Sequence, residues 1–143
     1  MTYHHEQAGR VYIGLGLLLL VPLAIGIFAK TPFLVWLTVA VGFLYWAFAR
    51  LRIDVEGAGA SSQIRWAMTF GWPGGRIPIA DVANAEIVPV TFWMGVGIHF
   101  TMRGWVWNVA LGKGVRIVKR NGSDVILGTD EPEELLAAIR RVR

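Results

Sequence analysis

The sequence predicts a helical membrane hairpin followed by a small α+β domain, in which about seven antiparallel strands precede one C-terminal helix. Two apolar runs without an internal charge fill residues 11–49 and predict the hairpin. From residue 51 apolar and polar residues alternate, as in half-buried strands. The end of the chain has the spacing of an amphipathic helix. Residues 1–10 are expected to form a polar tail, and residues 50–143 the domain.

The two apolar runs, residues 11–29 and 33–49, are joined by Lys30-Thr31-Pro32. At ~1.5 Å per residue each run makes a helix ~25–28 Å long, close to the ~30 Å hydrocarbon core of a bilayer. A cleaved signal peptide fits less well, because its apolar region usually has ~7–15 residues. Thr38 and Gly42 form a small-residue pair on which the helices are expected to pack.

Flanking charges predict the orientation of this hairpin. Arg10, Arg50 and Arg52 lie at one end, and Lys30 alone marks the other. Lys and Arg are enriched on the inner side of membranes. The sequence therefore predicts a multi-pass protein of the cell (inner) membrane, with both termini and the domain in the cytoplasm.

Alternation predicts the strands of the domain in order. Leu51, Ile53 and Val55 alternate with charged residues in the first strand. The other expected strands are residues 63–70, 76–79, 85–90, 98–102, 105–111, 114–120 and 123–127. Asn121-Gly122 predicts a two-residue turn between the last two, which would place Lys119 opposite Asp124.

The chain is expected to end in a helix. Thr129 and Asp130 can cap it, and Pro132 suits its first turn. An apolar stripe on this helix is expected to pack on the sheet. The stripe consists of Leu135, Leu136, Ile139 and Val142.

Two segments resemble bacterial pleckstrin-homology-like domains. Residues 114–139 read GVRIVKRNGSDVILGTDEPEELLAAI, and in that family a hairpin likewise leads into a helix that begins Gly-Thr/Ser-Asp-x-Pro-Glu. Residues 77–88, IPIADVANAEIV, are similar to the family's strand-loop-strand segment. Two apolar helices before such a domain look like its small membrane-anchored members. The resemblance implies a small barrel or sandwich and brings no shared catalytic residues.

Lipid-binding pleckstrin-homology domains carry Lys and Arg across their first hairpin. In this sequence the corresponding loop, residues 57–61, reads Gly-Ala-Gly-Ala-Ser and has no charge. A multiply charged headgroup needs several cations. The resemblance therefore does not imply specific headgroup recognition at that loop.

No sequence pattern is typical of an enzyme. Cys is absent, which excludes thiol catalysis and disulfides. Gly95-Val96-Gly97 lacks the third glycine of a dinucleotide motif, and Gly112-Lys113-Gly114 lacks the rest of a P-loop. His4-His5-Glu6 has no zinc-site spacing, and His99 is the only histidine of the domain. We expect no catalytic residue, no metal and no cofactor.

Binding at the membrane is the expected function. The net charge of +4 comes from scattered residues, so nucleic-acid binding is not expected. Arg50, Arg52 and Arg76 are candidates for contact with lipid headgroups. Trp72 and Trp93, in or beside loops, are candidates for contact with a partner or with the bilayer interface. The alternative is that they cover the ends of a small barrel. The leading interpretation is a non-enzymatic, membrane-anchored binding or assembly module whose partner is a membrane protein or a second copy. The alternative is a lipid-sensing or lipid-handling protein that contacts anionic headgroups.

Overall fold

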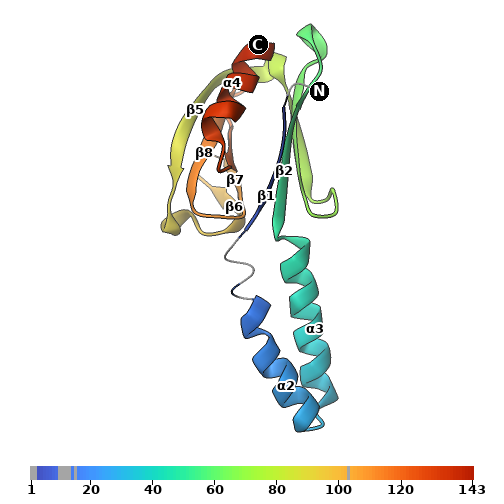
Figure 1. Cartoon of the computed structure of the whole chain (residues 1–143). Coiled ribbons are helices and arrows are strands. Elements are labelled where there is room, and N and C mark those ends of the chain that lie inside the picture. The colour runs from blue at the N-terminus through green and yellow to red at the C-terminus, as the bar shows by residue number, and fades with distance from the viewer. Residues whose placement is uncertain (1–2, 10–13, 15, 103) are drawn as a thin grey trace.

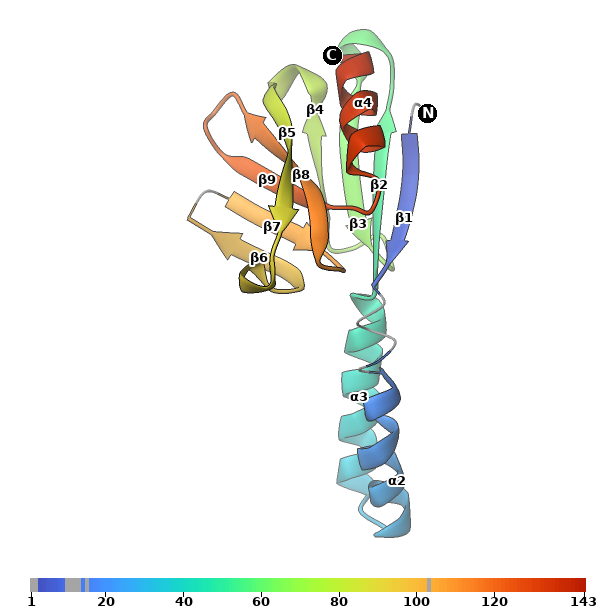
Figure 2. The same cartoon turned by 60° about the vertical axis from the view of Figure 1, so that its left-hand side comes forward.

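Two β-sheets pack face to face, and a pair of helices projects from one end of them (Figures 1 and 2). The computed structural model describes residues 3–9, 14, 16–102 and 104–143. The chain begins in a strand, makes the helical pair, and returns to the same sheet beside that strand. The strands then fill both sheets, and a helix ends the chain.

The first sheet has four antiparallel strands in the order β1-β2-β3-β4. They are β1 (Tyr3–Ala8), β2 (Arg50–Glu56), β3 (Gln63–Met68) and β4 (Gly74–Pro78). Residues of β2 and β3 alternate between buried and exposed, which confirms the predicted period of two. One face of the sheet is therefore apolar and faces the core, while the other carries the charges.

The second sheet has five strands in the order β5-β8-β9-β7-β6. They are β5 (Val82–Val90), β6 (Gly97–Thr101), β7 (Gly104–Asn108), β8 (Gly112–Lys119) and β9 (Asp124–Gly128). The pair β7 and β9 is parallel, and the other neighbours are antiparallel.

Between the sheets lies an apolar core in which Trp66 and Trp107 meet edge to face, with ring centroids 5.9 Å apart. The C-terminal helix α4 (Pro132–Val142) packs against β5 and β8. Leu135 and Ile139 are buried in that contact, as the predicted apolar stripe requires.

The projecting pair consists of α2 (Leu20–Phe28) and α3 (Pro32–Ala47). At ~1.5 Å per residue the 16 residues of α3 span ~24 Å, less than the ~30 Å hydrocarbon thickness. Within the described residues, none of the helices combines the length and the apolar character needed to cross a membrane. The predicted transmembrane hairpin of residues 11–29 and 33–49 is wrong on this finding. The predicted multi-pass inner-membrane location is wrong with it.

The predicted fold class also needs correction in the β-rich part. The described residues form nine strands rather than about seven, and β7 and β9 are parallel where an all-antiparallel arrangement was expected. The N-terminal segment, expected to be a polar tail, is the edge strand β1. Its short polar run, His4-His5-Glu6, carries no apolar alternation that would have indicated a strand.

The turn between β8 and β9 is longer than predicted. The amide of Gly122 donates to the carbonyl of Lys119, and the amide of Lys119 donates to the carbonyl of Ser123, both at 2.9 Å. Gly122 has φ +84°, which suits the left-handed position that follows a type I turn in a three-residue loop. The extra loop residue places Val118 opposite Asp124, so the predicted pairing of Lys119 with Asp124 is wrong.

Candidate functional site

The two projecting helices carry large apolar side chains that the described part of the chain leaves uncovered. We call α2, α3 and their connection, residues 20–47, the apolar hairpin. Its single charged residue is Lys30, at the tip. Side chains about half exposed or more occupy the face of each helix that is turned away from the other helix, with Phe28 87% and Trp36 72% exposed. The others are Leu20, Val21, Ile25, Ile27, Phe33, Leu37, Val39, Phe43, Leu44 and Trp46.

A narrow seam of small residues joins the two helices. Thr38 is buried, and its hydroxyl donates to the carbonyl of Leu34 at 2.7 Å. A Cβ added to Gly42 would lie 3.7 Å from Leu19 Cδ1, and one added to Gly26 would lie 3.0 Å from Val35 Cγ2. The predicted packing on Thr38 and Gly42 is thus confirmed. Because the seam is narrow, most of each helix faces outward.

Three aromatic rings connect the apolar hairpin to the first sheet. Phe70, just after β3, lies edge-on to Trp46 at 4.7 Å and stacks on Phe43 at 5.9 Å between ring centroids. The hydroxyl of Thr69 donates to the carbonyl of Trp46 at 3.0 Å. We call Phe43, Trp46 and Phe70 the aromatic junction. All three rings are about half exposed, so they also present an aromatic surface where the helices meet the sheets.

The first two predicted headgroup contacts, Arg50 and Arg52, are tied to one carboxylate of β1. Each guanidinium donates to a different oxygen of Glu6, at 3.2 Å in both cases. The hydrogen bond from Arg52, followed by that from Arg50, lowers the pKa of Glu6. These two arginines therefore help to hold β1 against β2, and their charges are partly balanced before any ligand arrives.

Arg76, the third predicted headgroup contact, lies farther from the helices. It faces Arg65 across β3 and β4 on the charged outer face of the first sheet. A hollow of about 580 Å³ on this face brings Arg52, Arg65 and Arg76 together with the indole of Trp72. Arg50 does not line it. The structure thus unites two of the three predicted arginines and adds Arg65, which sequence reasoning missed.

The two candidate partner contacts are strongly exposed, Trp72 by 78% and Trp93 by 92%. Trp72 belongs to the connection between β3 and β4, and Trp93 to a short helix, Phe92–Met94, after β5. Both loops lie at the end of the domain from which the helices project (Figures 1 and 2). Trp72 and Trp93 therefore belong to the end of the domain that lies next to the apolar hairpin.

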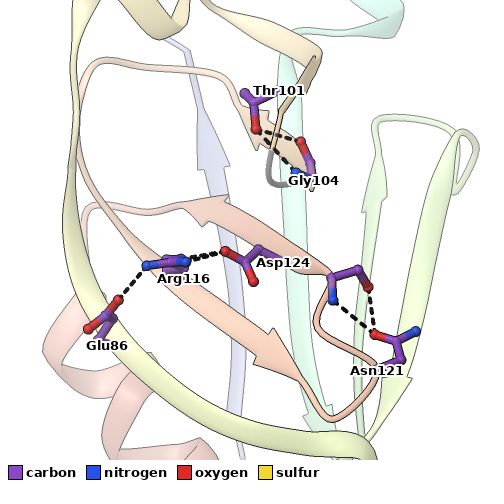
Figure 3. Close-up of polar contacts among 7 residues, drawn as sticks. Glu86, Thr101, Gly104, Arg116, Asn121 and Asp124 are labelled. Carbon is purple, nitrogen blue, oxygen red and sulfur yellow. Dashed lines mark hydrogen bonds and ion pairs between the residues drawn. The ribbon is translucent and has the colours of Figure 1, made fainter.

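An ion network crosses three strands on the outer face of the second sheet (Figure 3). Arg116 Nε donates to Asp124 Oδ2 at 2.7 Å, and Arg116 Nη1 donates to Glu86 Oε1 at 3.0 Å. The bond to Asp124 raises the pKa of Arg116. With both carboxylates engaged, the guanidinium clamps β5, β8 and β9 together. The register of the β8–β9 turn creates this network, so the sequence alone did not reveal it.

Polar side chains that face inward from β1 anchor the start of α4. His5 Nε2 lies 2.6 Å from Asp130 Oδ1, and His5 Nδ1 lies 3.1 Å from Glu131 Oε2. The hydroxyl of Tyr3 donates to Glu131 at 3.4 Å, and burial raises the pKa of Tyr3. These contacts join the two ends of the chain. Because β1 itself was not predicted, neither were they.

Metal binding and acid–base chemistry depend on which side chains meet among the described residues. They contain no group of three or more His, Asp or Glu side chains arranged to hold a metal ion. His99 Nε2 is buried without a hydrogen-bond partner in the described structure, and a Cβ added to Gly95 would lie 2.9 Å from it. Neither a protein-family model nor a curated protein matches the chain.

Proposed function

We propose that the protein is a non-enzymatic binding module that the apolar hairpin attaches to a lipid layer. The observation that carries this proposal is the exposure of large apolar side chains over the outward faces of α2 and α3, away from the seam between them. Burial of apolar surface contributes roughly 25 cal/mol per Å². A covering medium is therefore strongly favoured for these side chains.

Lipid suits this surface better than a protein partner does. A partner protein covers one face of a helix and leaves the opposite face polar, whereas a helix that is apolar all round is buried in a large core or in hydrocarbon. Apart from Lys30, residues 20–47 offer no charge to such a partner. The Lys30 ammonium can reach polar surroundings on its flexible stem. Such coverage by lipid needs no helix that crosses a bilayer.

Aromatic residues at the base of the helices support the same proposal. The aromatic junction and the loops that carry Trp72 and Trp93 lie where the helices meet the sheets (Figure 1). Indole and phenyl rings favour the boundary between hydrocarbon and water. We therefore assign Trp72 and Trp93 to the lipid–water interface. Contact of these residues with a partner protein stays a prediction.

The resemblance to pleckstrin-homology-like domains is kept as a proposal, although nine described strands and the parallel pair of β7 and β9 differ from the small antiparallel barrel or sandwich that it implies. The resemblance agrees with a binding role for the domain, because it brings no shared catalytic residues that could be carried over to this sequence.

Flotation of the full chain with neutral phosphatidylcholine vesicles tests the lipid attachment. The wild type is expected to float with the vesicles. Ile25→Arg and Leu37→Arg should each lower the partition about fiftyfold or more, because Arg in hydrocarbon costs ~2.5–3.5 kcal/mol. Met102→Arg is the matched control, because Met102 is fully exposed outside the hairpin.

Two results would contradict the lipid attachment. One is a full chain that stays in the lipid-free fraction while its sheets remain folded. The other is a discrete oligomer without lipid in which cross-links join the hairpins of two copies, because a second copy would then cover the apolar side chains.

A further inference from the structure

Two arginines face each other directly on the outer face of the first sheet. Arg65 of β3 and Arg76 of β4 are cross-strand partners, and both side chains are exposed. Like charges at directly opposed positions destabilise a sheet. Glu56 lies 3.7 Å from Arg65. Among the described residues, no carboxylate forms an ion pair with Arg76.

Arg76 also lines a second hollow, on the other side of β4. This hollow has a volume of about 510 Å³, and Lys119 and Arg120 from the β8–β9 turn line it together with Arg76. Asp81 contributes the one carboxylate among its described lining residues. Three cations therefore surround this space against one anion. We call Arg65, Arg76, Lys119 and Arg120 the basic band.

Three described carboxylates, Asp54, Glu56 and Asp81, line the two hollows, against five Arg or Lys side chains. In the first hollow Asp54 pairs with His4, and Arg52 pairs with Glu6 outside the hollow. Glu56 lies 3.7 Å from Arg65, its one ion-pair partner among the described residues. The exposed guanidinium of Arg76 thus lies between two hollows that are both bordered by cations.

We propose that the basic band binds a phosphate group, with Arg76 as its central ligand. One arginine fork is enough for the two oxygens of a carboxylate. A phosphate offers more oxygens, and can accept hydrogen bonds from Arg65 and Arg76 at once while Lys119 or Arg120 approaches from the other side. Bound phosphate would also offset the repulsion between the two opposed arginines.

The phosphate can belong to a lipid headgroup or to a compound in solution. The basic band lies on the sheets, at a distance from the base of the helices. Arg76 lies opposite Arg65, and Arg65 lies opposite Asp54 of β2. Asp54 is four residues from Arg50 along β2, so at ~3.3 Å per strand residue Arg76 is ~13 Å from Arg50 along the strand direction. A headgroup must bridge that distance, and a soluble phosphate compound need not.

Titration of the full chain in neutral detergent micelles with inorganic phosphate tests the site. Amide chemical shifts of β3, β4 and the β8–β9 turn are followed at constant ionic strength, with chloride as the exchanged anion. Saturable shifts are expected. Arg76→Gln and Arg65→Gln should each raise the dissociation constant for phosphate about tenfold or more, since they remove charge-assisted hydrogen bonds. Arg141→Gln removes the same charge from an exposed position of α4 and should leave it unchanged.

The proposal would be overturned by chemical shifts that do not saturate, or by an equal loss of phosphate affinity in all three variants. General screening of positive charge by phosphate would then explain the response. Vesicles of phosphatidylcholine with and without phosphatidic acid separate the sources. If phosphatidic acid increases vesicle binding and the increase requires Arg76, the phosphate belongs to a headgroup. If Arg76 is required for binding of inorganic phosphate but not for binding to these vesicles, the phosphate belongs to a soluble compound. The micelle titration does not depend on vesicle attachment, so it can succeed where flotation fails.

Discussion

Leucine side chains have opposite surroundings in two helices of this protein. In α4 Leu135 is fully buried against the sheets, whereas in α3 Leu37 and Leu44 are 47% and 57% exposed. The two helices also differ in sequence. Charged residues line one side of α4, while α3 has no charged residue. The sheets bury the apolar stripe of α4, but the described chain has no layer that covers α3.

This difference separates two sources of apolar burial. The domain of two sheets encloses its own core, with side chains such as Ile53 and Leu127 at 0% exposure. The apolar hairpin buries mainly a seam of small residues, and the described residues leave the rest of its apolar surface uncovered. Substitutions are therefore expected to act differently in the two regions.

The largest expected effect comes from a matched pair of helix leucines. Leu135→Ala should lower the unfolding free energy of the domain by about 2–5 kcal/mol, because it leaves a cavity in a closed core. Leu37→Ala should change it by less than about 0.5 kcal/mol, as is usual for a surface site. Urea unfolding in detergent, followed by near-ultraviolet circular dichroism, measures both. Equal losses would mean that the hairpin belongs to the same closed core.

A moderate effect is expected where the two regions meet. Trp46 and Phe70 lie edge to face at 4.7 Å, and such pairs contribute about 0.5–1.5 kcal/mol beyond their buried area. A double-mutant cycle of Trp46→Ala and Phe70→Ala should yield a coupling energy in that range. Coupling near zero would show that helices and sheets are joined only through the backbone.

The smallest expected effect concerns Glu6, in the strand that precedes the helices. Arg52 and Arg50 lower the pKa of Glu6 from 4.5, so the folded state favours the charged carboxylate. The stabilisation is complete well above pH 4.5 and is lost as the pH falls through the folded pKa. Because the side chain is partly exposed, the loss should stay below about 1 kcal/mol.

Amide hydrogen exchange in β1 at decreasing pH measures this loss, after correction for the intrinsic pH dependence of exchange. Glu6→Gln should remove the pH-dependent part. A wild type and a variant with identical profiles would show that the ion pairs with Arg50 and Arg52 do not stabilise β1.

Sequence reasoning located the strands with clear alternation and the C-terminal helix, because each of these depends on local periodicity. The predicted cap by Thr129 and Asp130 is wrong, since the N-cap of α4 is Glu131 and makes no side-chain cap hydrogen bond. It failed where one residue decides the geometry. Gly122 in the left-handed region lengthens the β8–β9 loop by one residue, and that shift creates the bridge from Arg116 to Asp124. No local pattern distinguishes this loop from the two-residue turn that Asn121-Gly122 predicts.

The candidate surfaces were only partly predictable for a similar reason. Arg50, Arg52 and Arg76 were chosen from their sequence neighbourhoods, but pairing between strands decides which charges meet. It brings Arg76 opposite Arg65 and leaves Arg50 with Glu6. The second helix was predicted nearly correctly, since α3 has 16 residues and ends at Ala47. The first was overestimated, because apolar character begins well before Leu20, where α2 starts.

The return of the chain to its starting point has a practical consequence. Ala8 and Arg50 are neighbours across β1 and β2, and the amide of Gly9 donates to the carbonyl of Ala49 at 2.9 Å. Topologically, everything between them is an insertion into a β-hairpin. Excising residues 10–49 and closing the gap with a short turn should therefore leave a self-sufficient domain. A fragment that merely starts at Arg50 would lack its outermost strand and would expose the edge of β2 to aggregation.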